Sequence, residues 1–403
     1  MTNQNKKMIY LLVGLNVLNY ADRFIISAVA PSIQNDLGFT DSQLGLIGTA
    51  FLWGFVLATP FVGALLRRFS PQIVLAFAVM AWSGATAATG IVRLLLSMLA
   101  LRAVIGIGQA VFSTASLPII EAMAAKSWKN TAITMYNAAM PIGIALGFIA
   151  GGYLDLAIGW QMGFVAVGIF GIPVALLLHC CPIKPVFNAN RPRYGKSRIL
   201  SLRYYPNYLI TLLGNILQIF AIAGFAFWAP VYFSRSLNYP AAEGSMIFGI
   251  IFICTGAVGT LFGGWLINRF AKNQDRQTLM KIIVYLMIPA SMGAFIAIAV
   301  SQALWFFIAM AVVQFLLFAT YTPFSLAFFQ TVPKDLKNTA YGVNMFLGRL
   351  AGDMFGIWFI GFLSTLIGGL SLAMYILPFT LVLATIIWYI SSKTSNLKLK
   401  TVN

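Results

Sequence analysis

The sequence predicts an all-α integral membrane protein with twelve transmembrane helices in two homologous halves. Three observations predict this class: the chain is poor in charge, its loops differ strongly in positive charge, and it contains an internal repeat. Of its 403 residues, 60% are hydrophobic and 9% are charged, whereas soluble domains carry about 25% charged residues. The chain therefore cannot cover a water-facing surface with polar groups, and we expect lipid to be most of its solvent.

Apolar runs bounded by charged or turn residues account for nearly the whole length. Each bilayer crossing needs about 20 mainly apolar residues, so no room is left for a soluble domain. An even number of crossings places both termini on one side. We predict an N-terminal six-helix bundle at 1–181, a cytoplasmic linker at 182–206 and a C-terminal six-helix bundle at 207–403. The twelve runs lie near residues 8–30, 43–66, 72–92, 94–118, 130–152, 160–181, 207–233, 244–267, 278–300, 303–329, 339–363 and 368–391.

Lysine and arginine gather in the loops on one side of the predicted bundle. Of the 26 such residues, only Arg93 and Arg235 fall in loops on the other side, and the arginines at 23, 102 and 349 lie within helices. Cytoplasmic loops carry such an excess, which predicts cytoplasmic termini and a multi-pass protein of the plasma (inner) membrane. The same distribution accounts for the net charge of +17, so no nucleic-acid partner is expected.

The two halves of the chain repeat each other. Residues Gly48–Phe69 and Gly249–Phe270 align without gaps at an offset of 201 residues, and eight of the 22 positions are identical. The stretch Lys129–Ala132 recurs as Lys337–Ala340, at the start of the predicted fifth and eleventh helices. Duplicated halves are typical of transporters that rock around a central site.

Several of these stretches resemble motifs of the major facilitator superfamily. Gly63–Phe69 occupies that superfamily's loop between helices two and three, and Gly264–Phe270 occupies the matching loop of the second half. Arg102–Gly108 resembles its fourth-helix motif, and Pro141–Gly152 resembles its fifth helix, where small residues let helix backbones approach closely. The resemblance implies the major facilitator fold and alternating access.

Within the superfamily, the sequence is most similar to the Spinster-like branch. The anion:cation symporter branch shares the first-helix Asn-Tyr-x-Asp-Arg motif and is the alternative. The resemblance implies an amphiphilic, anionic cargo such as a lysolipid. The matching stretches are residues 19–23 (NYADR), 141–152, 226–230 (AFWAP), 259–264 (GTLFGG) and 352–353 (GD).

The sequence departs from the family pattern at three positions. The superfamily usually has an acidic residue where this sequence has Arg67, and Asn268 stands at the equivalent place of the second half. The cytoplasmic latch of the fold is therefore expected to be altered. Spinster-like proteins carry a glutamate seven residues after the fourth-helix arginine, and that position is Gln109 here. A neutral amide cannot exchange a proton, so proton coupling through this position is in doubt. Facilitated diffusion is therefore an alternative to proton-coupled transport.

Ionisable residues inside the apolar runs are the strongest functional candidates. Asp22 and Arg23 in the first helix and Arg102 in the fourth are expected at similar depth, where an unpaired charge costs at least about 2.5–3.5 kcal/mol. We expect Asp22 to contact Arg23 or Arg102. We hypothesise that Asp22 is a protonatable switch and that Arg23 or Arg102 binds an anionic headgroup through paired hydrogen bonds. A permanent ion pair between helices is the structural alternative. Together with Gln109, these residues form the predicted coupling and ion-pair set.

Other polar and aromatic side chains are candidates for the substrate cavity or for gating. Few charges, several amides and many aromatics suit an amphiphile better than a sugar, whose hydroxyls need many partners. Arg349 and Asp353 stand four residues apart, the spacing at which helical side chains meet. The cavity candidates, which the resemblance places on the first, fourth, seventh and tenth helices, are Asn16, Asn19, Phe112, Asn215, Gln218, Phe225, Trp228, Gln314, Phe318 and Tyr321. The gating candidates are Arg67, Arg68, Asn268, Arg269, Arg349 and Asp353.

We expect a secondary active transporter and not an enzyme. The alternatives are a small organic-anion/proton symporter, a facilitative uniporter and, from another class, a membrane-embedded enzyme. Against an enzyme, the sequence has no nucleophile–base set, and its three cysteines and one histidine lack metal-ligand spacing. No cofactor and no metal are expected, with protons as the candidate coupling ion. The expected partners are a small-molecule or lipid-like substrate and membrane lipids, and the protein is expected to be a monomer.

Overall fold

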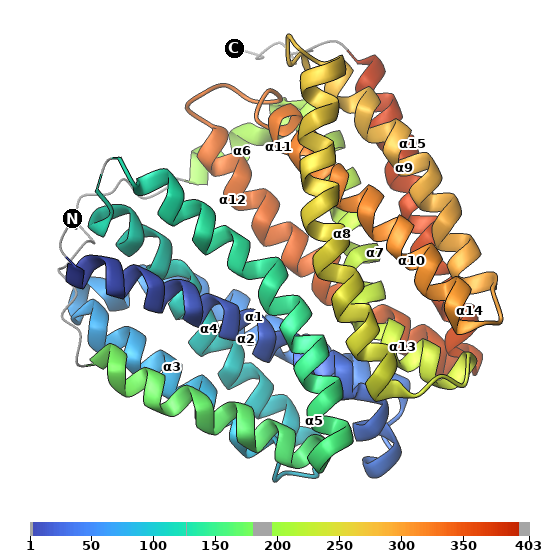
Figure 1. Ribbon diagram of the computed structural model, residues 1–403. Coiled ribbons are helices and arrows are strands. Elements are labelled where there is room, and N and C mark those ends of the chain that lie inside the picture. Colours follow the sequence, from blue (N-terminus) through green and yellow to red (C-terminus); the bar gives the residue numbers. More distant parts are fainter. Residues whose placement is uncertain (1–2, 126, 180–195, 395–403) are drawn as a thin grey trace. The chain divides into compact units, whose positions relative to one another are not determined.

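The computed structural model describes residues 3–125, 127–179 and 196–394, which contain helices and no strand (Figure 1). Within these ranges, eleven helical segments are long and apolar enough to cross a membrane. The longest, α5 (Lys129–His179), is interrupted at Gly159 (φ 79°, ψ 157°), a conformation that favours glycine. Gly159 lies between the predicted fifth and sixth crossings, so α5 supplies two of the twelve. The predicted all-α membrane class is confirmed.

The chain divides into two compact units. The first contains the described residues up to 179 together with residues 233–250, and the second contains residues 196–232 together with 251–394. Of the predicted linker, residues 182–195 lie outside the described residues, and the rest forms α6 (Lys196–Ser201) and the short η1 (Leu202–Tyr204). The predicted domain boundaries stay predictions.

Helices of the first unit pack in close pairs, α1 along α5, α2 along α4, and α3 against both α4 and α5. A Cβ added at Gly147 of α5 would lie 2.6 Å from the carbonyl oxygen of Ala21 in α1. A Cβ at Gly54 of α2 would lie 2.0 Å from the carbonyl oxygen of Ala103 in α4. The glycines therefore permit the close helix approach that the sequence predicted. The bounds are α1 (Asn3–Leu37), α2 (Asp41–Arg68), α3 (Pro71–Thr89) and α4 (Leu95–Met123).

The start of α2 is fixed by a capping box. The Thr40 hydroxyl accepts from the backbone N–H of Gln43, and the Gln43 side chain accepts from the backbone N–H of Thr40. These bonds satisfy N–H groups that the first helical turn leaves without partners. Asp41 lies in this first turn, where negative charge is favourable.

Helices of the second unit also pack closely through glycine. A Cβ added at Gly263 of α8 would lie 2.2 Å from the carbonyl oxygen of Ala319, at the end of α10. The run predicted as one helix at 303–329 is divided there into α10 and α11, since Pro323 lacks the N–H that would bond the Ala319 carbonyl. The remaining bounds are α7 (Pro206–Ser236), α8 (Ala241–Phe270), α9 (Arg276–Ala299), α10 (Ala303–Ala319), α11 (Tyr321–Phe328), α12 (Lys337–Leu347), η2 (Gly348–Met354), α13 (Phe355–Ile367), α14 (Leu370–Met374) and α15 (Ile376–Lys393).

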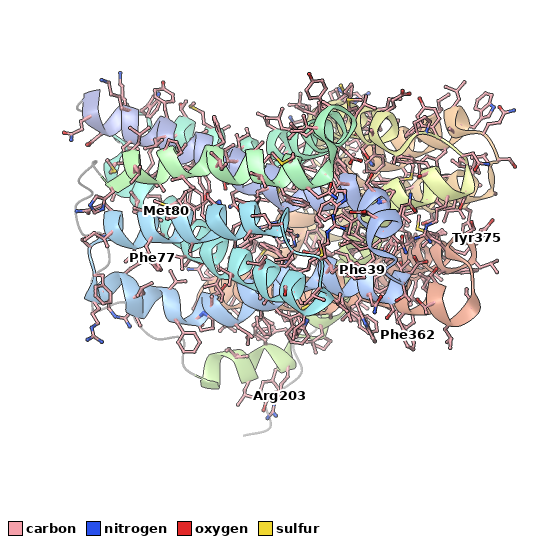
Figure 2. The ribbon with its side chains drawn as sticks, turned by 90° about the horizontal axis from the view of Figure 1, so that it is seen from below. Phe39, Phe77, Met80, Arg203, Phe362 and Tyr375 are labelled. Carbon is pink, nitrogen blue, oxygen red and sulfur yellow. The ribbon has the colours of Figure 1, made fainter. Side chains whose placement is uncertain are left out.

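Many large apolar side chains are exposed, as expected where lipid is the solvent. Phe77 of α3 is 74% exposed and Phe362 of α13 is 41% exposed (Figure 2). The η2 segment is a π-helical turn that joins α12 to α13. Such turns interrupt α-helices rarely and often at functional positions.

Candidate substrate and coupling site

The predicted charged residues of the first unit are buried together with Gln109. Asp22 is 4% exposed, Arg23 is 9% exposed and Arg102 is 1% exposed. Asp22 and Arg23 come from α1, and Arg102 and Gln109 come from α4, which contacts α1. Among the described residues, Asp22 is the only fully buried acidic side chain.

Asp22 is held by neutral donors. The Thr86 hydroxyl donates to one carboxylate oxygen at 2.7 Å, and the Gln109 amide donates to the other at 2.8 Å. Within the described part of the chain, Asp22 makes no direct ion pair, although Arg102 and Arg23 attract it electrostatically. The contact expected between Asp22 and an arginine is therefore replaced by hydrogen bonds from two neutral side chains. Thr86 on α3 was missed, since a lone threonine in an apolar run gives little signal.

Both arginines lie against aromatic rings. The guanidinium carbon of Arg23 lies 4.6 Å from the ring centre of Phe51 and 4.9 Å from that of Tyr20. The guanidinium carbon of Arg102 lies 5.6 Å from the centre of the same Phe51 ring. Such cation–π contacts stabilise a cation without neutralising its charge.

Arg102 has hydrogen-bond donors without partners. Its Nε and one terminal nitrogen are buried and have no hydrogen-bond partner within the described structure. Two arginines face one aspartate, so the cluster carries an excess positive charge. A buried charge is costly unless it is paired. The arrangement can therefore accept an anion.

The other candidates of the first unit join α1 to its neighbours. The Asn16 amide donates to the backbone carbonyl of Tyr136 at 2.9 Å, and the Asn19 amide donates to the Ser113 hydroxyl at 3.0 Å. The Asn19 carbonyl oxygen is buried without a partner. Phe112 is fully buried and meets the ring of Trp82 edge-on at 5.5 Å.

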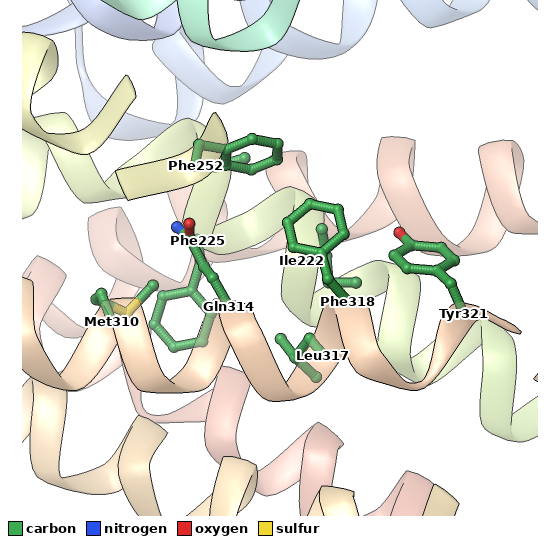
Figure 3. A pocket seen from close by; sticks show the side chains of 9 residues that line it. Ile222, Phe225, Phe252, Met310, Gln314, Leu317, Phe318 and Tyr321 are labelled. Atoms are coloured by element: carbon green, nitrogen blue, oxygen red, sulfur yellow. The ribbon is translucent and has the colours of Figure 1, made fainter. Parts of the chain in front are cut away.

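Four of the predicted cavity residues line a single pocket of the second unit. Phe225, Gln314, Phe318 and Tyr321 come from α7, α10 and α11 (Figure 3). The amide of Gln314 lies among aromatic rings, and the Thr255 hydroxyl donates to its oxygen at 3.4 Å. Sequence reasoning missed the remaining lining residues, because apolar residues inside uniformly apolar runs carry no distinguishing signal. These are Ile222, Ala226, Phe252, Met310 and Leu317.

Three other candidates of the second unit lie outside this pocket. The Asn215 amide donates to the Asn344 side chain at 2.9 Å, and the Gln218 amide donates to the Thr320 hydroxyl at 2.8 Å. The indole N–H of Trp228 donates to the backbone carbonyl at position 357 at 2.9 Å. These bonds tie α7 to its neighbours.

The gating candidates fall into two groups. Arg67 and Arg68 end α2 and are exposed, as are Asn268 and Arg269 near the end of α8. The Arg349 and Asp353 side chains form a partly buried ion pair at 2.5 Å on the η2 turn, as their spacing predicted. Both charges also act on the phenol of Tyr321 in the pocket.

Comparison with known proteins identifies the class of molecule. The chain is 23% identical to a probable sphingolipid transporter, spinster homolog 2 of Arabidopsis thaliana, over 96% of this chain and 86% of that protein. It is 27% identical to the sphingosine-1-phosphate transporter SPNS2 of Xenopus tropicalis, over 89% of this chain and 73% of that protein. The predicted resemblance to the Spinster-like branch is confirmed.

The fold is shared with solved transporters. A crystal structure of a bacterial homolog of the human lysosomal transporter Spinster matches with a TM-score of 0.84 at 19% identity, covering 98% of both chains. The nucleoside transporter NupG matches with a TM-score of 0.73 at 14% identity, covering 98% of this chain and 100% of that one. These relatives are transporters, which agrees with the expectation that the chain is not an enzyme. The Major Facilitator Superfamily profile matches residues 12–355, and the chain therefore belongs to the Major Facilitator Superfamily.

Proposed function

We propose that this transporter moves an amphiphilic, anionic, lipid-like solute by alternating access. The observation that carries the proposal is the buried guanidinium of Arg102, in which Nε and one terminal nitrogen have no hydrogen-bond partner within the described structure. Arg102 and Arg23 together exceed the single negative charge of Asp22. The relatives named as sphingolipid and sphingosine-1-phosphate transporters support the same substrate class.

The anionic part of the cargo follows from charge and geometry. A guanidinium presents donors in a planar fork that fits carboxylate or phosphate. In the structure, Asp22 does not use this fork; Thr86 and Gln109 donate to its two oxygens instead. An anionic headgroup would satisfy the unpartnered donors of Arg102 and offset the excess charge.

The apolar part of the cargo follows from the pocket of the second unit. Its wall is made of aromatic and aliphatic side chains, with Gln314 and Tyr321 as the polar members. Such a wall suits an acyl chain and offers few partners to a sugar or a peptide backbone. The composition of this wall therefore favours a lipid-like cargo over a small carboxylate, which is the alternative substrate class.

Coupling, if it uses protons, goes through Asp22. Gln109 cannot titrate, and Asp22 is the one fully buried acid among the described residues. Protonation of Asp22 would remove the negative charge beside the two arginines and so strengthen anion binding. We propose a proton as the coupling ion and no other cofactor, with facilitative transport as the competing mechanism.

Reconstitution into liposomes tests the substrate and the coupling together. We expect uptake of a lysolipid with a phosphate headgroup, little uptake of small carboxylates, and a flux that changes when a pH gradient is imposed. Asp22→Asn should remove the response to the gradient, whereas Lys129→Gln, which neutralises a partly exposed partner of Glu121, should keep it. Equal uptake of lysolipid and small carboxylate would contradict the proposed substrate class. A wild-type flux that does not respond to the pH gradient would contradict proton coupling and favour facilitative transport.

We further propose that both termini face the cytoplasm of a plasma (inner) membrane and that the chain acts as a monomer. The support for the orientation is the distribution of lysine and arginine. The loops predicted to lie outside the cytoplasm contain only Arg93 and Arg235, whereas the loops on the side of the termini are rich in both residue types. A reporter fused after residue 403 that is active only outside the cytoplasm should be silent, and an active reporter would contradict the orientation.

A further inference from the structure

One aromatic ring is shared by the two buried arginines of the first unit. Phe51 of α2 is 1% exposed, and the guanidinium carbons of Arg23 and Arg102 lie 4.6 and 5.6 Å from its ring centre. Arg23 comes from α1 and Arg102 from α4, so three helices meet at this ring. Phe51 was not among the residues predicted from the sequence, because a phenylalanine inside an apolar run carries no distinguishing signal.

The position of Phe51 is fixed by the close packing of α2 on α4. A Cβ added at Gly106 of α4 would collide with the backbone carbonyl oxygen of Phe51. Gly106 follows Arg102 by four residues, so both lie on the face of α4 that is turned toward α2. Because Gly106 has no side chain, the two backbones can approach, and the Arg102 side chain one turn away reaches the Phe51 ring.

Two further rings lie against Arg23. Its guanidinium carbon is 4.9 Å from the ring centre of Tyr20 and 5.3 Å from that of Phe55. Tyr20 precedes Arg23 by three residues and Phe55 follows Phe51 by four, which are the spacings at which side chains on a helix become neighbours. Arg23 therefore contacts three rings, and Phe51 is the ring that it shares with Arg102.

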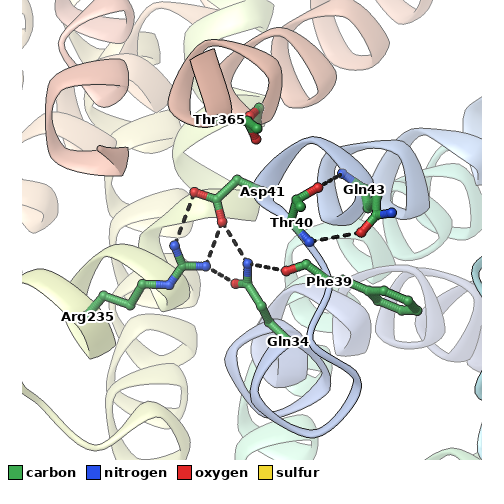
Figure 4. A network of polar contacts seen from close by, with 8 residues as sticks. Gln34, Phe39, Thr40, Asp41, Gln43, Arg235 and Thr365 are labelled. Atoms are coloured by element: carbon green, nitrogen blue, oxygen red, sulfur yellow. Dashed lines mark hydrogen bonds and ion pairs between the residues drawn. The ribbon is translucent and has the colours of Figure 1, made fainter. Parts of the chain in front are cut away.

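Another arginine of the first unit shows the alternative way of holding a guanidinium. The two terminal nitrogens of Arg235 donate to the two carboxylate oxygens of Asp41 at 3.1 and 2.6 Å (Figure 4). This pairing fixes Arg235, but it occupies the donors that would receive an anion. An aromatic ring attracts a guanidinium through its π face and leaves the N–H groups available. Arg102 is held in this second way, since its Nε and one terminal nitrogen have no hydrogen-bond partner within the described structure.

We infer that Phe51 is a positioning residue for the anionic headgroup of the cargo. Its ring holds the two guanidiniums beside each other and offsets part of their mutual repulsion, while the donors of Arg102 stay available. Asp22 attracts Arg102 electrostatically. Without the π face of Phe51, a direct pair between Arg102 and Asp22 would use the donors that the headgroup needs. The inference rests on the proposed function, in which Arg102 binds the headgroup, and adds the residue that keeps Arg102 in place for it.

Fluorination of the ring tests the inference with little change in the shape of the side chain. Mono-, di- and trifluorinated phenylalanine are introduced at residue 51 of the full-length protein through a suppressor tRNA, and they withdraw electrons stepwise from the π face. The KM and kcat for uptake of a phosphate-bearing lysolipid and of its uncharged analogue are measured in liposomes. We expect the KM for the anionic lipid to rise with each fluorine, to at least about fivefold with the trifluorinated ring. The kcat and the KM for the uncharged lipid should stay near the wild-type values.

Two further variants separate the charge distribution of the ring from its bulk. Phe164 of α5 is as buried as Phe51 and meets Trp160 edge-on at 6.2 Å, and the same fluorinated residues placed there should leave both KM values unchanged. Phe51→Leu removes the π face but keeps an apolar side chain, and it should raise the KM for the anionic lipid at least as much as the trifluorinated ring. Thermal inactivation without cargo is measured in parallel. It should accelerate along the series more steeply at residue 51 than at residue 164, because contacts with two cations are weakened.

The outcomes distinguish this inference from the proposed function. If wild type prefers the anionic lipid and its KM does not change along the series at residue 51, the positioning role is overturned and the proposed function stands. Equal thermal inactivation in the two fluorinated series would show that the Phe51 ring does not hold the arginines, and it would overturn the inference without any measurement of cargo. A wild type without preference for the anionic lipid would contradict the proposed function, and the positioning role would fall with it.

Discussion

The two units bury polar groups in different ways. In the first unit, two arginines and one aspartate are buried together, and Arg102 keeps donors without partners. In the second unit, buried amides are matched to other polar side chains, such as Asn215 to Asn344. The partly buried Arg349 and Asp353 of the second unit form an ion pair and neutralise each other. Both units therefore use glycines for close helix packing, while the chemistry of their interiors differs.

This difference separates a functional buried charge from a structural one. Arg276 of the second unit is 4% exposed, and it donates to the Ser391 carbonyl at 3.0 Å and to the Thr394 carbonyl. It therefore caps the last turn of α15, where a cation is favourable. Arg102 is buried as deeply, but lacks such partners. The predictions below use this contrast.

The largest effect on stability is expected at Arg276. Arg276→Ala should lower the stability of the protein by about 1.5–3 kcal/mol, because hydrogen bonds to a charged group are lost at the end of α15. Thermal inactivation in detergent measures this loss. The matched control is Arg269→Ala, an exposed arginine at the end of α8. Equal losses in the two variants would show that Arg276 is not a structural cap.

A glycine pair tests whether packing is shared by both units. Gly263→Ala should destabilise by about 1–3 kcal/mol, because the new Cβ would meet the backbone of α10. Gly264→Ala has nothing within 4 Å of its Cβ and should be neutral or stabilising. Gly54→Ala is the equivalent test in the first unit. Thermal inactivation without a difference between Gly263→Ala and Gly264→Ala would refute the packing argument.

A smaller effect is expected from the self-neutralised pair of the second unit. The double variant Arg349→Gln with Asp353→Asn removes both charges and leaves the net charge of the interior unchanged. The preference for anionic over uncharged lysolipid should therefore stay within about twofold of wild type, because the net Coulombic attraction is preserved. Competition uptake with the two lipids measures this ratio. Loss of the preference for the anionic lipid in this variant would show that Arg349 and Asp353 of the second unit take part in headgroup recognition.

The smallest effect concerns Asp275, which caps the start of α9 outside the membrane span. The backbone N–H of Thr278 donates to its carboxylate at 2.9 Å, which lowers the pKa of Asp275. The cap therefore contributes stability at neutral pH and loses it as the pH falls through the lowered pKa. At pH values below about 4, thermal inactivation of wild type should accelerate as the cap is protonated. In Asp275→Asn this acceleration should be slightly smaller. An unchanged pH profile would show that the cap is not linked to stability.

The sequence predicted the helices and their close packing because these depend on local patterns. Apolar runs, positive loops and glycine spacing are properties of contiguous residues. Asp22 and Arg102 could be selected because charges inside apolar runs are rare.

Pairings between distant residues could not be predicted in the same way. Thr86 donates to Asp22 across 64 residues, and Arg235 meets Asp41 across 194 residues. Nothing in either local sequence marks these partners. The predicted ninth helix begins near residue 278, whereas α9 begins at Arg276, which the structure buries.

The central claim is that Arg102 binds the anionic part of the cargo. The most direct test is the ratio of uptake of a phosphate-bearing lysolipid to that of its uncharged analogue, in wild type and in Arg102→Ala. We predict a clear preference for the anionic lipid in wild type and a loss of about tenfold or more in that preference in the variant, because charge-assisted hydrogen bonds are lost. A variant that keeps the wild-type ratio would contradict the account.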